Sequence, residues 1–185
     1  MKKKKSKVMV ALALGLSLGL SLQAQSTMVG GQEMMPQKNI VENAVNSMDH
    51  TTLVSAVKAA ELVETLQSKG PFTVFAPVND AFENLPSGVL GSLLEEGNKK
   101  KLRTVLTYHV LAGKWDFEAL NTKIKASGGS FSIETVAGEK LHFSMNGQRN
   151  IIVKDAKGNV ANISVYDVYQ SNGVIHVIDR VLLPK

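Results

Sequence analysis

The order of two hydrophobic periodicities constrains the fold of this chain more than any other feature. In the first half, apolar residues recur at spacings of three and four, as at Leu53, Ala56 and Val57, whereas in the second half they alternate with polar residues, as at Leu141 and Phe143. The first spacing is typical of a helix with one buried face, and the second of a half-buried strand. Helices followed by antiparallel strands predict an α+β fold rather than alternating α/β units.

The first half is predicted to hold three helices and one strand. Amphipathic spacing predicts one helix over 52–68 and another from the lysines at 99–101 to the glycine at 113. The Asp80-x-x-Glu83 pattern predicts a short capped helix through residue 85. Between the first two helices, the run Phe72–Pro77 is apolar, β-branched and aromatic, which predicts a strand buried on both faces.

The second half is predicted to consist of strands. An Asn-Gly pair between apolar runs is a strong hairpin signal, and Asn172-Gly173 therefore predicts a turn before the last strand. Alternation and flanking turn residues place the strands at about 131–135, 141–145, 151–154, 161–169 and 174–178.

The N-terminus has the order of a secretory signal. Five lysines among residues 2–7 precede Val8–Leu22, a stretch without a charge that is short for a bilayer span. We interpret residues 1–24 as a signal peptide, cleaved after Ala24 or Ser26, with a retained membrane anchor as the alternative. Residues 25–37 lack sustained periodicity and are predicted to be a flexible spacer, so that 38–185 form one domain.

Charge and cysteine content exclude several classes of function. The formal charge of +5 comes from the five N-terminal lysines, because the remaining basic residues equal the 16 acidic ones in number. After cleavage of the signal peptide the protein is neutral, so we expect it to bind neither nucleic acid nor anionic membranes. The signal predicts export to the periplasm, the cell surface or the outside of the cell, and we expect no membrane insertion after cleavage. The chain has no cysteine, which excludes a cysteine nucleophile, a lipid-modified cysteine and disulfides.

Motifs for standard chemistry are missing from the sequence. It contains no glycine-rich nucleotide fingerprint, phosphate-binding loop, zinc-protease motif or Gly-x-Ser-x-Gly elbow. The four histidines, at 50, 109, 142 and 176, lie far apart without metal-ligand spacing. We expect no cofactor, no metal site and no enzymatic activity.

Three residues have two possible roles. His109 lies on an otherwise apolar helical stripe beside Tyr108, so it is either a buried imidazole bonded across the core or a recognition residue. His176 interrupts the last apolar strand, where core packing or a cross-strand bond is expected. Trp115, the only tryptophan, either packs the preceding helix on the sheet or forms an exposed anchor for a partner.

Several ordered blocks resemble the fasciclin domain family. The segment 70–82, GPFTVFAPVNDAF, resembles the first block of the family, and 171–179, SNGVIHVID, resembles the second. Between them Tyr108-His109 is similar to the Tyr-His motif of the family, and residues 53–60 are similar to its first long helix. The resemblance covers about residues 38–185 and implies a wedge-shaped β-sandwich of about seven strands with several packed helices.

The resemblance also implies a function and candidate residues. Fasciclin domains mediate adhesion, which in animal relatives is attributed to the Tyr-His motif and to an Asp-Ile pair before the second block. The matching positions are Tyr108, His109, Asp167 and Val168, where valine replaces the isoleucine of the family. With Trp115 they are the candidate residues for binding a cell-surface or matrix protein or polysaccharide.

Two other functions remain open at this point. An exported hydrolase could use Ser, His and Asp residues that meet only in the folded chain, with His109 or His176 as the base. A carrier of a small ligand could use a gap between helices and sheet, for which the sequence gives no sign. The partner, the oligomeric state and the physiological process are not encoded in any motif.

Overall fold

A seven-stranded mixed sheet forms the centre of the molecule. The computed structural model describes residues 26–185, so the predicted signal peptide lies outside the described residues. The strand order is β4-β3-β9-β8-β7-β6-β5, and only β3 and β9 are parallel neighbours. The α+β prediction is confirmed. The strands are β3 (Phe72–Pro77), β4 (Val110–Ala112), β5 (Ser130–Glu134), β6 (Lys140–Asn146), β7 (Asn150–Lys154), β8 (Val160–Gln170) and β9 (Gly173–Ile178).

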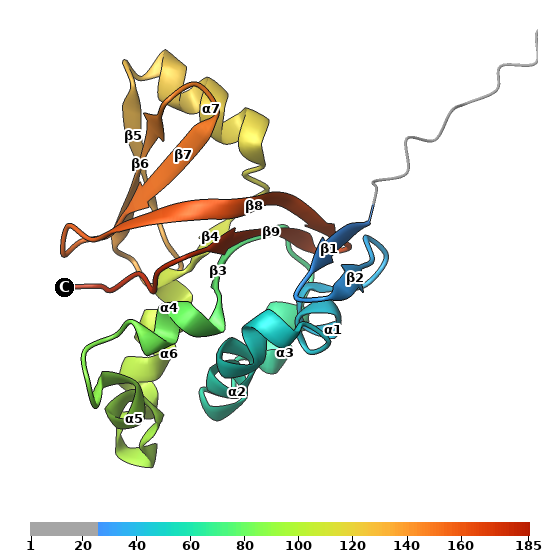
Figure 1. Ribbon diagram of the computed structural model, residues 1–185, viewed down its shortest axis with the longest axis vertical. Coiled ribbons are helices and arrows are strands. Elements are labelled where there is room, and N and C mark those ends of the chain that lie inside the picture. Colours follow the sequence, from blue (N-terminus) through green and yellow to red (C-terminus); the bar gives the residue numbers. More distant parts are fainter. Residues whose placement is uncertain (1–25) are drawn as a thin grey trace, which may run out of the picture.

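The long strand β8 joins two parts of the sheet that point in different directions (Figure 1). Its register against β9 shifts twice, between Ile163 and Val165 and between Val165 and Val168. Such irregularities bend a strand and increase its twist. The sheet consequently folds over on itself, with β5, β6 and β7 steeply inclined to β8 and β9 in Figure 1.

Each face of the central strands contributes to a different hydrophobic core. On β3, Val74 and Ala76 belong to the core beneath the N-terminal helices, whereas Phe75 points into the core formed with β5–β8 and α7. All six residues of β9 are buried. This double burial explains why both strands are mostly apolar, and the predicted strand over residues 72–77 is confirmed.

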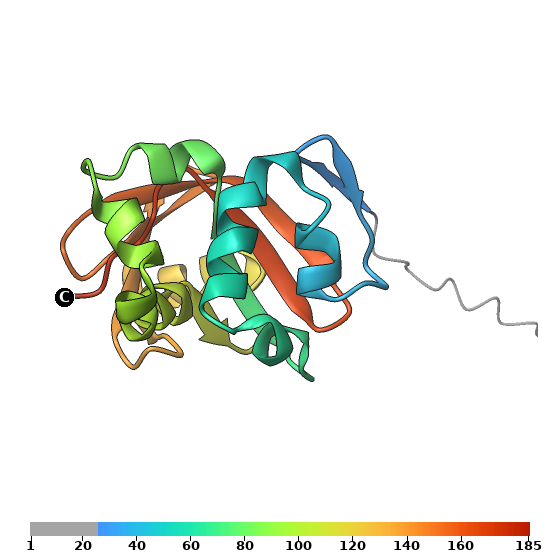
Figure 2. The same cartoon turned by 90° about the horizontal axis from the view of Figure 1, so that it is seen from below.

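Most helices cover one face of the sheet, as Figure 2 shows from below. The helix α7 lies apart from them, beside β5 and β6 (Figure 1). The helices are α1 (Ile40–Ala44), α2 (Thr51–Ala59), α3 (Val63–Gln67), α4 (Asn79–Glu83), α5 (Val89–Leu94), α6 (Lys99–Tyr108) and α7 (Phe117–Ala126), with 3-10 turns η1 (Met48–His50) and η2 (Glu96–Asn98).

The single helix predicted over 52–68 is wrong, because the chain forms α2 and α3 with a break between them. Glu61 adopts a left-handed conformation, with φ of 54°. Its N–H donates to the Lys58 carbonyl, and the Leu62 N–H donates to the Val57 carbonyl at 3.1 Å. This pattern is a Schellman ending in which a buried Leu62 provides the hydrophobic contact. Glycine is the usual sequence sign of such an ending, and none is present here.

The second predicted helix is also shorter than expected. The helix α6 ends at Tyr108, and Val110 already pairs with Val74 as part of β4. The Asp80 cap is wrong as well, since Val78 precedes α4 and no side chain caps that helix. Instead, the Asn79 side chain accepts a hydrogen bond from the Thr52 N–H at the start of α2.

Residues 27–34 form a β-hairpin where an irregular spacer was predicted. The strands β1 (Thr27–Val29) and β2 (Gln32–Met34) pair in antiparallel fashion across Gly30 and Gly31, both of which have positive φ. Val29 and Met34 are buried in the core beneath the helices. The strands were not predicted from the sequence because three residues are too few to show an alternating pattern.

The last hairpin is confirmed, with its turn one residue earlier than predicted. Gln170 pairs with Gly173, so the two turn residues are Ser171 and Asn172. The Asn172 side chain accepts a hydrogen bond from the Ile40 N–H and donates to the carbonyls of Leu66 and Ser68. Asn172 therefore ties the hairpin to both α1 and α3.

Candidate functional site

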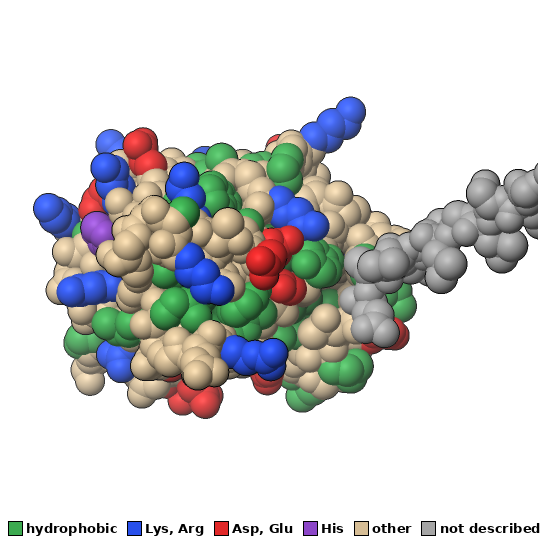
Figure 3. Space-filling model, turned by 90° about the horizontal axis from the view of Figure 1, so that it is seen from above, with side chains coloured by type: hydrophobic (Ala, Val, Ile, Leu, Met, Phe, Trp, Pro, Cys, Tyr) green, Lys and Arg blue, Asp and Glu red, His purple; other side chains and the backbone are tan. Residues whose placement is uncertain are grey.

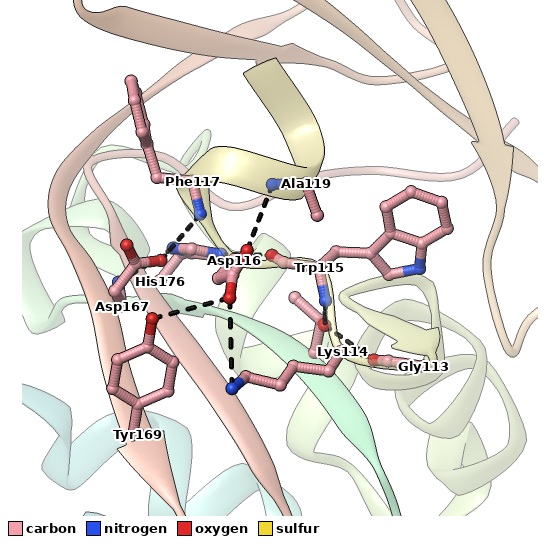
Figure 4. A network of polar contacts seen from close by, with 10 residues as sticks. Gly113, Lys114, Trp115, Asp116, Phe117, Ala119, Asp167, Tyr169 and His176 are labelled. Carbon is pink, nitrogen blue, oxygen red and sulfur yellow. Dashed lines mark hydrogen bonds and ion pairs between the residues drawn. The ribbon is translucent and has the colours of Figure 1, made fainter. Parts of the chain in front are cut away.

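The loop between β4 and α7 brings two of the predicted site residues together. Figure 4 shows Trp115 on this loop and Asp167 on the neighbouring strand β8. The Thr73 hydroxyl anchors the loop to β3, because it donates to the Gly113 carbonyl and accepts from the Trp115 N–H, each at 2.8 Å. The loop is consequently fixed on the sheet at Gly113 and at Trp115.

His176 of β9 holds the middle of this loop. Its Nδ1 accepts a long, 3.4 Å contact from the Asp167 N–H, so Nε2 carries the proton and donates to the Trp115 carbonyl at 2.8 Å. Burial lowers the pKa of His176, although the Trp115 carbonyl acts in the opposite direction. The imidazole is therefore neutral at pH 7 and serves as a bridge between β8, β9 and the loop.

Asp167 occupies the point where β8 bends. It is one of two non-glycine residues with positive φ among residues 26–185, at 56°. Its carboxylate accepts a hydrogen bond from the Phe117 N–H at 2.7 Å, at the first residue of α7. Asp116 caps the same helix through the Ala119 N–H. Both acids therefore satisfy backbone donors at the start of a helix, where negative charge is also favoured by the helix dipole.

The outer part of this network is accessible to solvent. The Tyr169 hydroxyl lies 3.5 Å from the Asp116 carboxylate, and the Lys114 Nζ lies 4.3 Å from the centre of the Tyr169 ring. The Lys114 ammonium also pairs loosely with Asp116, at 3.9 Å. An aromatic ring and a cation thus stand side by side at the surface, an arrangement well suited to partner recognition.

Lys114 and Tyr169 also line a polar groove of about 660 Å³. Other lining residues come from the end of α3 and the following loop, including Lys69, and from Asn39 before α1. The side chains in the groove can donate and accept hydrogen bonds, and its lining contains lysines but no acidic residue. We take this groove, with the loop beside it, as the candidate partner-binding site.

The remaining predicted site residues lie inside the molecule. The Tyr108 ring is fully buried, and its hydroxyl donates to the Lys140 carbonyl and accepts from the Ala156 N–H, each at 2.9 Å. Burial raises the pKa of Tyr108 to about 12. Val168 is also buried, at 1% exposure. Neither side chain is accessible for direct contact with a partner.

His109 is buried and fully bonded to the backbone. Its Nδ1 lies 2.8 Å from the Val105 carbonyl, and its Nε2 accepts from the Leu182 N–H at 2.9 Å. Of the two roles left open by the sequence, these contacts match the structural one, in which the imidazole joins α6 to the C-terminal segment. Burial lowers the pKa of His109 to about 4, so the ring is neutral at pH 7.

The arrangement does not favour a hydrolase. The ring nitrogens of His109 and His176 are all engaged by backbone groups. A Ser47–His50 pair exists, with 2.8 Å between Oγ and Nδ1, but both residues are buried. A Cβ on Gly30 would lie 2.3 Å from the Ser47 hydroxyl, so the β1–β2 turn covers that oxygen. A substrate could not reach it without local opening.

Residues 26–185 give no indication of a metal centre. They contain no group of three or more histidine, aspartate or glutamate residues that could hold an ion. The sequence prediction included Trp115 and Asp167, which lie in or beside this loop, but it did not include Lys114 and Tyr169. Lysine and tyrosine at these positions belong to no motif, and only the sheet topology brings them together with Lys69.

Asp167 allows a test of whether its role is structural. We expect Asp167→Ala to lower the free energy of unfolding by about 2 kcal/mol. The substitution leaves the Phe117 N–H without its acceptor, and alanine tolerates the positive φ at this position less well than aspartate does. Asp167→Asn keeps an acceptor and tolerates this conformation, so its stability should lie within about 0.5 kcal/mol of the wild type. Urea denaturation checks both values, and equal stability of the two variants would contradict this role.

Comparison with known proteins agrees with the fold. The fold is an α+β module in which Asp116, Asp167, His109 and His176 all bond to backbone groups. The sequence model of the Fasciclin domain matches residues 48–184, and the chain belongs to that family.

Relatives and a solved structure support this assignment. The Synechocystis protein sll1483 is 49% identical over 78% of this chain and 73% of its own length. The pig transforming growth factor-beta-induced protein ig-h3 is 38% identical over 71% of this chain, which spans only 17% of that protein. A FAS1 domain pair from the insect cell adhesion molecule Fasciclin I shares the fold, with a TM-score of 0.68 and 19% identity over 80% of this chain and 52% of that one.

Proposed function

We propose that this chain is an exported fasciclin module that binds a cell-surface or matrix protein or polysaccharide without catalysis. The groove lined by Lys69, Lys114 and Tyr169 carries the proposal, since it joins two cations and an aromatic ring on a rigid frame. An insect relative of the same fold is described as a cell adhesion molecule. The predicted signal peptide supports export, and no helix within residues 26–185 has the length and apolarity to cross a membrane.

The charge of the groove indicates the chemistry of the partner. Lysine is the sole charged residue type in its lining, whereas other parts of the surface mix both signs, as the face in Figure 3 shows. The Asp116 carboxylate lies beside the groove, 3.9 Å from the Lys114 ammonium, but the charges that line the groove are positive and attract ligands of the opposite sign. An acidic polysaccharide or an acidic protein segment is therefore the partner that the groove fits best.

Charge reversal in the groove tests this function. We expect Lys69→Glu/Lys114→Glu to reduce capture of the surface partner at least about tenfold, because two attractive contacts become repulsive. The measurement is a pull-down from extracts of the producing cell's own surface, followed by titration of the recovered partner.

The matched control is Lys123→Glu/Lys125→Glu, which makes the same charge change on exposed positions of α7. All four lysines are exposed, so both variants should keep the wild-type denaturation midpoint. Equal capture by both double variants would refute the groove as the binding site. Turnover of a surface polymer by the purified chain would refute the non-catalytic part of the proposal.

A further inference from the structure

An apolar cavity of about 350 Å³ lies between the N-terminal helices and the sheet. The helices α1, α2 and α3 form one side, and β3, β8 and β9 form the other (Figure 2). This is the size of a pocket for a small molecule, and it is distinct from the polar groove. Its walls are mainly aliphatic side chains, among them Ile40, Leu53, Val57, Leu66, Val74 and Ile175.

One histidine in this wall has a ring nitrogen without a hydrogen bond. His50, at the end of η1, is 3% exposed, and its Nδ1 is engaged by the Ser47 hydroxyl at 2.8 Å. Its Nε2 makes no hydrogen bond, and is one of only two such buried side-chain atoms among residues 26–185. The Ala76 backbone, also in the cavity wall, is close enough to favour the charged ring without reaching hydrogen-bond geometry. An unpaired buried nitrogen is costly unless something binds to it.

Electrostatics restrict what could occupy the cavity. Burial lowers the pKa of His50, so the ring is neutral at pH 7 and cannot compensate a buried carboxylate. The charged residues in the lining, Glu42 and Lys58, are exposed. Aliphatic cavities hold water poorly and take up apolar molecules readily. A suitable occupant is therefore an uncharged molecule that is mostly hydrocarbon and carries an oxygen.

We propose that this cavity binds a neutral single-chain lipid whose oxygen function hydrogen-bonds with His50 Nε2. The hydrocarbon chain would lie against α2, whose nine residues extend over roughly 14 Å, between the helix and the aliphatic face of β3 and β9. The protein would then have two separate sites, a polar groove for a macromolecule and an apolar cavity for a lipid. This inference does not depend on the proposed function of the groove.

The experiment uses the full chain and the uncharged fluorescent probe N-phenyl-1-naphthylamine, with 1-dodecanol, dodecane and dodecanoate as competitors. We expect the probe to bind and dodecanol to displace it at lower concentrations than the other two. Val54→Trp fills the cavity from α2 and should weaken probe binding at least about tenfold, whereas Ser55→Trp, on the exposed side of the same helix, should not. Val41→Trp on α1 provides a second way of filling the cavity if Val54→Trp fails to fold.

His50→Phe tests the polar contact separately. It should retain the probe but bind dodecanol about fivefold more weakly, which is the value of one hydrogen bond, and so lose the preference for dodecanol over dodecane. Equal probe binding by the wild type, Val54→Trp and Val41→Trp would overturn the proposal. A wild-type dimer that Val54→Trp converts to a monomer, with no probe binding, would assign the cavity to a second copy of the chain and overturn it too.

Discussion

Replacing Gly173 with alanine is expected to destabilise the protein by at least ~3 kcal/mol, which is a large share of the stability of an ordinary domain. Gly173 opens β9 beside β3, and a Cβ added there would lie 2.1 Å from the Phe72 carbonyl oxygen. The obstructing atom belongs to the backbone of a central strand, so it cannot move aside by changing rotamer. The glycine is therefore required for close approach of two strands rather than for a turn.

Gly91→Ala is the matched control for this prediction. Gly91 lies within α5, where an added Cβ would meet no atom within 4 Å. Alanine is favoured over glycine inside a helix by up to about 1 kcal/mol, so this variant should equal or exceed the wild type in stability. Urea denaturation gives both free energies of unfolding. Gly173→Ala with wild-type stability would contradict the packing of β3 on β9.

Acidification is expected to destabilise the protein through its buried histidines. The pKa of His109 is lowered from 6.5 in the unfolded chain to about 4 in the folded one. Since the unfolded chain binds the proton more readily, this contribution to stability is present above pH 6.5 and is lost as the pH falls toward 4. The loss from His109 alone amounts to about 3 kcal/mol. His50 and His176, whose pKa values are also lowered by burial, act in the same direction.

The His109→Gln variant isolates this contribution. Glutamine can replace both backbone contacts of the imidazole but does not gain a proton. Between pH 7 and pH 4.5, the free energy of unfolding of the variant should therefore fall by roughly 2–3 kcal/mol less than that of the wild type. His142→Gln is the control, because that side chain lies on the exposed face of β6. Urea titrations at the two pH values give the comparison. A wild-type protein as stable at pH 4.5 as at pH 7 would rule out this role for the histidine.

Much of the fold could be predicted because several strands carry strong local patterns. Double burial makes β3 mostly apolar, and single burial makes β6 alternate, so both were identified at nearly their true bounds. The break between α2 and α3 could not be predicted, since a left-handed Glu61 in place of a glycine gives no signal. The hairpin at 27–34 could not be predicted for a related reason, because its strands are stabilised by burial of Val29 and Met34 in a distant core.

The candidate site could be predicted from the sequence less well than the fold. The motifs that resemble the family are strongest where the chain packs, and they include Tyr108, His109 and Val168, whose side chains are buried. The groove is assembled from segments about a hundred residues apart, as Lys69 and Tyr169 show, and no local spacing encodes that meeting. The apolar cavity could not be predicted either, because its lining residues have the same sequence pattern as those of an ordinary filled core.

In the proposed function, buried motif residues hold the scaffold and groove residues select the partner. The most direct test is the affinity of the Tyr108→Phe variant for the recovered surface partner, measured at a temperature at which the variant is folded. Phenylalanine fills the same space but removes the hydroxyl shared by Lys140 and Ala156, so stability should fall by about 1–3 kcal/mol. We predict a partner affinity within twofold of the wild type. Loss of binding by the folded variant would contradict the account.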